Sequence, residues 1–284
     1  MRAVVLVLVA LLVAGCASTS TYDAPTVRVD ATDVDLPTTP ACVRGSQACI
    51  DAVVAQMQER YTTLAAACDH RAAFALMYLR VTEGVKQPSS SRFADQRYLR
   101  RLDALFAGYY FRAFDAYQDG RPTAPAWRIA FDAARHGRTT GIGDMLLGMN
   151  AHISNDLPFA ALAAGVSPKT RTDFDAVNDL LGDVQEPMIR EESRLLDPSV
   201  ANSTLPYLGV RRGEIANVIA GWRSEAWQNA RRLAEAPPGA ARERVAARIR
   251  AAAGERAQVI QALASNRLLS GDPSKRDAFC LARR

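Results

Sequence analysis

The chain has 284 residues, of which 49% are hydrophobic, 7% aromatic and 23% charged. This composition is typical of a globular protein and excludes intrinsic disorder, a collagen-like repeat and a polytopic membrane protein. The net charge of +5 is unevenly placed: residues 17–40 carry −3, residues 41–230 carry none and residues 231–284 carry +7. A basic excess at one end, without interleaved aromatic residues or a recognisable motif, gives no ground for nucleic-acid binding.

The first 16 residues, MRAVVLVLVALLVAGC, are typical of a bacterial lipoprotein signal. Arg2 precedes an apolar run over residues 3–14, which is shorter than the roughly 20 residues of a membrane span but suits a signal-peptide core. Small residues then lead to Cys16, as in a lipobox. We expect residues 1–15 to be removed and Cys16 to carry acyl chains such as palmitate. The alternative is an ordinary signal peptide with a chance cysteine.

Such a signal predicts attachment to the cell envelope. A triacylated cysteine exceeds the two acyl chains needed for stable membrane anchoring. Ala17 follows the cysteine, and by resemblance to lipoprotein sorting it favours the periplasmic face of the outer membrane if the cell is Gram-negative. Residues 16–40, rich in Thr, Asp and Pro, are expected to form an extended tether. Residues 41–284 are then the folded domain.

The domain contains four further cysteines, Cys42, Cys49, Cys68 and Cys280. An even number in an exported chain predicts disulfides. Of the three pairings, we favour Cys42 with Cys49, which encloses a short loop, so that Cys280 joins the C-terminal tail to Cys68. Four free thiols are the alternative, and a zinc site is disfavoured because no CxxC pair occurs.

From residue 41 onward the hydrophobic periodicity is helical, without an alternating strand pair, and predicts an all-α domain of seven or eight helices. In chain order the expected helices are 47–66 and 69–86 (two helices or one bent one), 94–118, 124–135, 140–155, 172–194, 211–235 and 239–264. Pro158 is expected to end the fifth. Thr172 and Asp175 resemble a capping box for the sixth.

The last of these helices is basic and amphipathic. Its apolar residues near one face are Val245, Ile249, Ala252, Ile260 and Leu263. Its arginines either lie against anionic lipid headgroups of the membrane or form an ordinary solvated face.

The densest polar pattern is GMNAHISNDLP, residues 148–158. Asp144, Gly148, His152 and Asp156 recur every four residues and would share one face of a helix. Gly148 is expected to leave open space beside the His152 ring, and Asp156 to orient that ring.

Three interpretations of this motif remain open. It is a buried hydrogen-bonded network that fixes neighbouring helices, a ligand-binding or active site that includes Asn150, or a divalent-metal site. In the metal interpretation His152 and Asp156 bind one ion, and His70 is the better third ligand among the remaining histidines.

Two arginines lie at positions where a helix is otherwise apolar. Arg223 shares a face with small residues and with Trp227, on which it can stack. Arg80 lies in a similar setting, although Glu83, three residues further on, can simply pair with it. Such arginines either clamp a carboxylate or phosphate, or pair with Asp156 or Asp144 across the core.

Several segments together carry a resemblance: GMNAHISNDLP, YLRVTE at 78–83, DFDAVN at 173–178 and WRSEAW at 222–227. Over roughly residues 50–235 the chain resembles a family of uncharacterised bacterial helical domains of unknown function. The resemblance implies an all-helical domain whose central motif contains Asn150, His152 and Asp156, and it implies no activity.

Three classes of function follow. An enzyme of the hydrolase or acid–base type would use His152 as base, Asp156 as its orienting partner and Arg223 to stabilise an anion. A binding module would hold a small anionic or lipid-derived ligand with Arg80, Arg223 and Trp227. A structural envelope protein would use the motif for folding alone.

Overall fold

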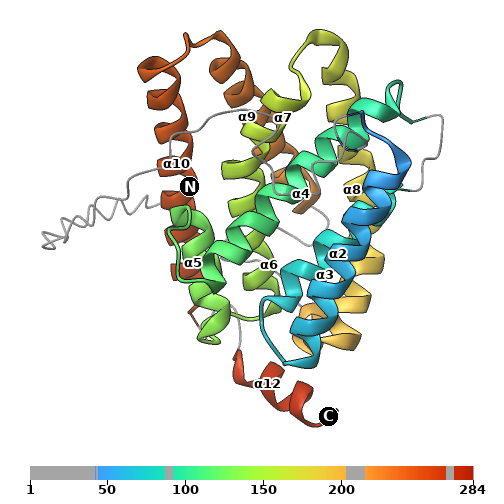
Figure 1. Ribbon diagram of the computed structural model, residues 1–284. Coiled ribbons are helices and arrows are strands. Elements are labelled where there is room, and N and C mark those ends of the chain that lie inside the picture. The colour runs from blue at the N-terminus through green and yellow to red at the C-terminus, as the bar shows by residue number, and fades with distance from the viewer. Residues whose placement is uncertain (1–41, 43, 87–91, 203–214, 267–271, 284) are drawn as a thin grey trace, which may run out of the picture.

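The computed structural model describes residues 42, 44–86, 92–202, 215–266 and 272–283. The expected signal peptide, Cys16 and the tether lie outside these residues. Within them every regular element is a helix, which confirms the all-α prediction (Figure 1). None of the described helices is both long enough and apolar enough to span a bilayer.

The α-helices are α2 (Gln47–Ala66), α3 (Ala72–Lys86), α4 (Gln96–Gln118), α5 (Pro125–Arg135), α6 (Gly141–Met149), α7 (Leu157–Ala164), α8 (Pro168–Leu195), α9 (Ile215–Glu235), α10 (Ala240–Ala264) and α12 (Ser274–Leu281). A π-helix, η1 (Asn150–Asp156), joins α6 to α7, and a 3-10 helix, η2 (Pro198–Asn202), follows α8. With α6, η1 and α7 counted as one continuous helix, the described residues hold nine, against seven or eight predicted. The additional helix is α12.

The π-helix η1 is the centre of the arrangement. It packs against α4, α5, α9 and α10, while α2 covers α3 and α3 in turn packs on α8. In Figure 1, α5 and α10 lie on one side of the bundle, α2 and α8 lie on the other, and α12 lies at the end opposite the turn between α9 and α10. Residues of η1 are therefore enclosed by helices on several sides.

The start of α8 differs from the sequence prediction. The capping box consists of Ser167 and Thr170, not of Thr172 and Asp175. The Ser167 hydroxyl accepts from the Thr170 amide at 3.2 Å, and the Thr170 hydroxyl accepts from the Ser167 amide at 3.0 Å. Pro168 then occupies the first turn, where an amide donor is not needed. The helix consequently begins four residues earlier than predicted.

The predicted break at Pro158 is also wrong. The amide of Leu157 donates to the carbonyl of His152, five residues back, which is the π-helical pattern. This wider turn lets the chain pass from α6 into α7, with Pro158 in the first turn of α7 and its missing amide donor tolerated there. Pro158, predicted from the sequence to end a helix, instead follows a change from π-helix to α-helix.

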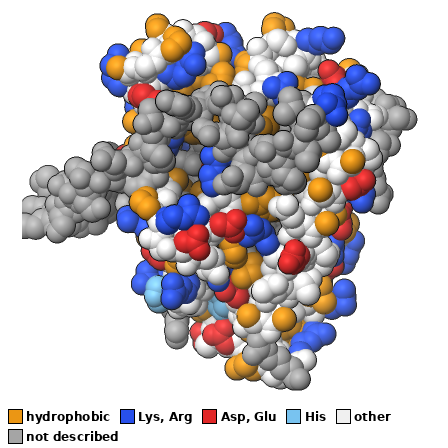
Figure 2. All heavy atoms as spheres, viewed as in Figure 1, with side chains coloured by type: hydrophobic (Ala, Val, Ile, Leu, Met, Phe, Trp, Pro, Cys, Tyr) orange, Lys and Arg blue, Asp and Glu red, His pale blue; other side chains and the backbone are white. Residues whose placement is uncertain are grey.

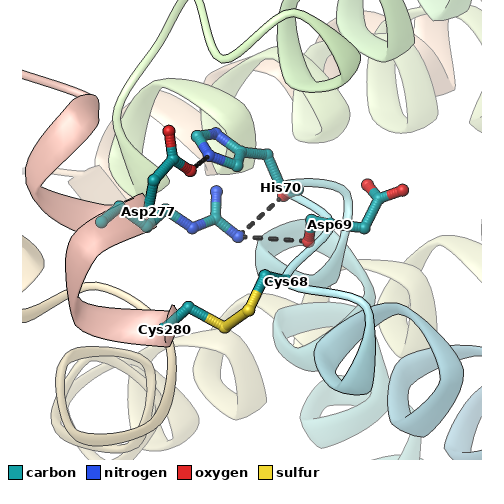
Figure 3. The surroundings of a disulfide bond; sticks show 6 residues. Cys68, Asp69, His70, Asp277 and Cys280 are labelled. Carbon is teal, nitrogen blue, oxygen red and sulfur yellow. Dashed lines mark hydrogen bonds and ion pairs between the residues drawn. A yellow bond between two sulfur atoms is a disulfide. The ribbon is translucent and has the colours of Figure 1, made fainter. Parts of the chain in front are cut away.

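Both favoured disulfides are present in the structure, Cys42–Cys49 and Cys68–Cys280. The second joins the segment before α3 to α12 (Figure 3). Beside it, the buried guanidinium of Arg276 donates to the carbonyl of His70 at 3.1 Å. The C-terminal tail is therefore a helix packed against the domain, held by a covalent bond and by a buried arginine.

The buried face of helix α10 overlaps only partly with the predicted one. Ile249 and Ile260 are buried as expected, but Ala252 is exposed. The remaining buried positions are small: Ala246, Ala253, Gly254, Ala257 and Ala264. Small side chains allow α10 to approach α5 and η1 closely. On the face shown in Figure 2, basic and acidic side chains are interspersed.

Candidate functional site

The site is built around the carboxylate of Asp156, the last residue of η1. It accepts hydrogen bonds from Trp127 Nε1 at 2.8 Å, from His152 Nδ1 at 3.0 Å and from Asn155 Nδ2 at 2.6 Å. Asp156 is 2% exposed. A buried carboxylate is stable only when its oxygens are satisfied, and three converging donors meet that requirement.

The bond to Asp156 fixes the protonation of His152. Because a carboxylate only accepts, Nδ1 carries the proton and Nε2 keeps its lone pair. Burial lowers the pKa of His152, and this outweighs the opposing effect of Asp156. The imidazole is therefore neutral at pH 7. Its ring stacks on Phe106, with centroids 3.4 Å apart, and meets the edge of Tyr78 at 4.3 Å.

His152 Nε2 has no hydrogen-bond partner among the described residues, and His152 lines a cavity of about 70 Å³ between α3, α4, η1, α8 and α9. The lining is mostly apolar: Phe74, Met77, Val81, Val85, Leu99, Leu102, Phe106, Met149, Ile153, Leu157, Val177, Leu181 and Ile219. The other polar or charged lining residues are Tyr78, Asp103 and Arg223. A largely apolar cavity with a few converging polar groups is the usual form of a small-molecule site.

Asp103 and Tyr78 add two more unpartnered atoms to this cavity. Asp103 Oδ2 and the Tyr78 hydroxyl are both buried without a partner in the described part of the chain. Burial raises the pKa of Asp103 to about 7 and raises that of Tyr78 well above its ordinary value. Below pH 7 both groups are therefore neutral hydrogen-bond donors. His152 Nε2, by contrast, is a hydrogen-bond acceptor.

Arg223 contributes the positive charge. Its Nε donates to Asn178 Oδ1 at 2.8 Å and an Nη donates to the carbonyl of Phe174 at 2.6 Å, so neither partner is a carboxylate. Burial lowers the pKa of Arg223 to about 10, which leaves the group protonated at neutral pH. A buried cation whose hydrogen-bond partners in the described part of the chain are neutral oxygens is suited to binding an anion.

The expected surroundings of Arg223 were wrong in two respects. Its guanidinium lies over the ring of Phe174, at 4.5 Å, and not over Trp227, which instead packs against Phe174 at 4.9 Å. Pairing with Asp156 or Asp144 is also absent, because Asp156 is satisfied by η1 and α5, and Asp144 binds Arg276 at 2.9 Å.

Arg80 lies outside the cavity lining. It pairs with Glu191 and Glu83, each at 2.7 Å, on partly exposed surface. The pairing of Arg80 with Glu83, three residues further on, is therefore confirmed. The alternative pairing of Arg80 with Asp156 or Asp144 across the core is wrong, since Glu83 and Glu191 of α8 bind it. Of the proposed ligand-binding residues Arg80, Arg223 and Trp227, the structure places only Arg223 at the cavity.

His70 belongs to a separate polar cluster beneath α12. Its Nε2 lies 2.6 Å from Asp277 (Figure 3). Its Nδ1 lies 3.4 Å from Asp144. Burial lowers the pKa of His70, but Asp144 and Asp277 outweigh it, so the pKa is raised overall. The structure thus brings His70 to α12 and not to His152. Among the described residues, no three His, Cys, Asp or Glu side chains are placed to hold a metal ion.

Two other residues of the central motif have structural contacts. Asn150 donates to the carbonyl of Ala253 at 2.9 Å and so ties η1 to α10. Gly148 does not leave open space: a Cβ there would lie 2.3 Å from the ring of Phe74. The expectation of free space beside His152 at that glycine is wrong, because Phe74 occupies it.

Sequence analysis missed Asp103 and Tyr78 as site residues. A signal for Asp103 existed. It lies four residues after Leu99 and three before Phe106, on the buried face of α4. A carboxylate on the apolar face of an amphipathic helix is unusual in the same way as Arg223, because a buried charged group needs a partner or a function.

Comparison with known proteins shows that the chain belongs to a family of unknown function, DUF5995, which matches residues 50–263. No curated protein and no solved structure matches it. Two of the segments that carried the resemblance meet in space, since Phe174 and Asn178 of DFDAVN accept hydrogen bonds from Arg223 of WRSEAW. Helix α12 lies beyond the matched residues.

The close approach at Gly148 gives a stability prediction. We expect Gly148→Ala to destabilise the domain by about 1–3 kcal/mol, because the new methyl group overpacks the buried Phe74 ring. Gly182→Ala in α8 is the matched control, since nothing lies within 4 Å of its Cβ. It should be stabilising by about 0.5–1 kcal/mol. Denaturant midpoints compare them, and a Gly148→Ala protein as stable as the unmodified one contradicts the packing described here.

Proposed function

We propose that the domain is a binding module for a small carboxylic acid with an apolar body, held in the cavity beside His152. One observation carries this proposal: His152 Nε2 is a buried hydrogen-bond acceptor without a partner among the described residues, and its ring lines an apolar cavity. An unpaired buried acceptor costs about 1–3 kcal/mol. A carboxylate cannot donate to Nε2, but a water molecule bound with the ligand can donate both to Nε2 and to a carboxylate oxygen, and it recovers that free energy.

The other lining groups support a carboxylic acid in particular. Arg223 offers a charge for a carboxylate. Asp103, when protonated, and Tyr78 offer donors to carbonyl or carboxylate oxygens. The apolar remainder of the lining suits a hydrocarbon body. Because Asp103 becomes negative as its proton is lost near pH 7, the cavity favours an acid most strongly below that pH.

Butanoate is a suitable probe, because it is small and has both a carboxylate and a hydrocarbon body. We expect it to bind the unmodified protein, and Arg223→Gln to weaken binding roughly tenfold or more, through loss of a charge-assisted hydrogen bond. Arg171→Gln is the matched control: Arg171 lies 5.3 Å over Trp227 and pairs with Asp175, but it does not line the cavity. The measurement is a chemical-shift titration with butanoate and with butan-1-ol.

The control variant should bind butanoate like the unmodified protein, and butan-1-ol should respond little to Arg223→Gln. If butanoate does not bind, or if both arginine variants behave alike, the cavity is not the proposed site.

A second candidate function is acid–base hydrolysis at the same place. His152 lines the cavity, its Nε2 has no partner among the described residues, and its Nδ1 donates to Asp156. This is the arrangement of a general base and its orienting carboxylate. If so, p-nitrophenyl butanoate should be hydrolysed, and Asp156→Asn should slow hydrolysis at least about a hundredfold by disturbing the His152 tautomer. Butanoate binding should survive that substitution. Release of p-nitrophenol no faster than in buffer rejects the hydrolase and leaves the binding module.

We also propose that the mature protein is a lipoprotein held in the cell envelope by acyl chains on Cys16. The support is the sequence MRAVVLVLVALLVAGC with its short apolar run and terminal cysteine. We expect cells given a labelled palmitate to incorporate the label into the protein, and Cys16→Ser to abolish labelling and membrane sedimentation. Cys280→Ser is the control cysteine variant. Its labelling should persist, and unlabelled membrane protein with Cys16 intact contradicts lipidation.

A further inference from the structure

A second cavity, of about 60 Å³, adjoins the first. The two share five lining residues: Met77, Val81, Met149, Leu181 and Ile219. The second extends away from Arg223 and His152, along α6, α8 and the start of α9. The shared residues lie on α3, α6, α8 and α9 and form the wall between the two cavities. Movement of the flexible side chains of Met77 and Met149 in this wall would join the two cavities into one slot.

The two halves of the slot differ in chemistry. The first contains His152, Asp103, Tyr78 and Arg223, whereas the described lining of the second has Gln185 as its one polar side chain. A ligand with its polar group at one end and a hydrocarbon chain at the other matches this division. A compact acid would fill the first half alone.

Methionine is concentrated along the second half. Of the six methionines in the chain, four line it: Met77, Met145, Met149 and Met188. Methionine side chains are flexible and adapt to irregular apolar partners. Such a lining suits a chain of variable conformation better than a rigid ring. The two volumes, about 70 Å³ and about 60 Å³, together come close to the roughly 150 Å³ engineered cavity that takes up benzene. A ligand with more non-hydrogen atoms than benzene therefore fits only when the flexible methionine side chains move aside, which sets a limit on the chain length.

We propose that the ligand is a medium-chain, unbranched fatty acid, with its carboxyl group beside Arg223 and His152 and its chain running between α3 and α8 into the second cavity. This inference rests on the proposed function and adds the class and direction of the ligand.

The test is a chain-length series of butanoate, hexanoate, octanoate and hexadecanoate, titrated by calorimetry. For the unmodified protein, affinity should rise roughly tenfold for every two methylenes up to octanoate. Hexadecanoate should gain nothing further. Ala216→Phe, which places a large ring on the wall of the second cavity alone, should remove the gain for octanoate and leave butanoate unchanged. Val184→Phe fills the same space from α8 and should act in the same way.

Asn217→Phe is the matched control, because it adds the same ring at an exposed neighbouring position outside both linings. It should bind the whole series like the unmodified protein. If butanoate binds but chain length gives no gain, or if neither cavity-filling variant alters octanoate, this inference is overturned while the proposed function stands. If no acid of any length binds, the proposed function itself has failed.

Discussion

The carboxylate of Asp156 is the constraint on which the centre of this domain depends. It is buried where Trp127 of α5 and His152 and Asn155 of η1 all donate to it. Removing these donors would leave an uncompensated charge in the core, which is among the most destabilising changes a protein can undergo. The wider π-helical turn supplies the geometry, because it lets the chain continue past Pro158 while two side chains of η1 reach the same carboxylate.

The polar groups of the cavity follow from that arrangement. A histidine whose Nδ1 is committed to Asp156 must present a bare Nε2 elsewhere, and here the ring is enclosed by Phe106 and Tyr78 beside an apolar space. Arg223 reaches the same space from α9, and its hydrogen-bond partners among the described residues are neutral oxygens. Folding alone would favour apolar side chains at such positions. The joint presence of these polar groups at one cavity is the basis of the proposed binding function.

The sequence alone was sufficient to predict the helical class, the pairing of His152 with Asp156 and the position of Arg223 on an otherwise apolar helix face. Each of these is a local pattern along one helix. It was insufficient where the decisive contact is remote. Asp144 follows the same four-residue spacing as His152, yet it pairs with Arg276, far along the chain. The change to a π-helix after Met149 leaves no signature in hydrophobic periodicity, and Asp103 gains its meaning only from the residues that α3 and η1 bring beside it.

The bond between Cys68 and Cys280 also has a consequence for the order in which the molecule matures. Cys280 lies in α12, the last of the described helices, and 212 positions separate it from Cys68. During synthesis or translocation from the N-terminus, Cys42 and Cys49 emerge together and can join at once. Cys68 cannot form its bond until Cys280 in α12 has been made. Closure of this bridge therefore requires every helix from α3 to α12, and a product truncated before Cys280 leaves Cys68 without its partner.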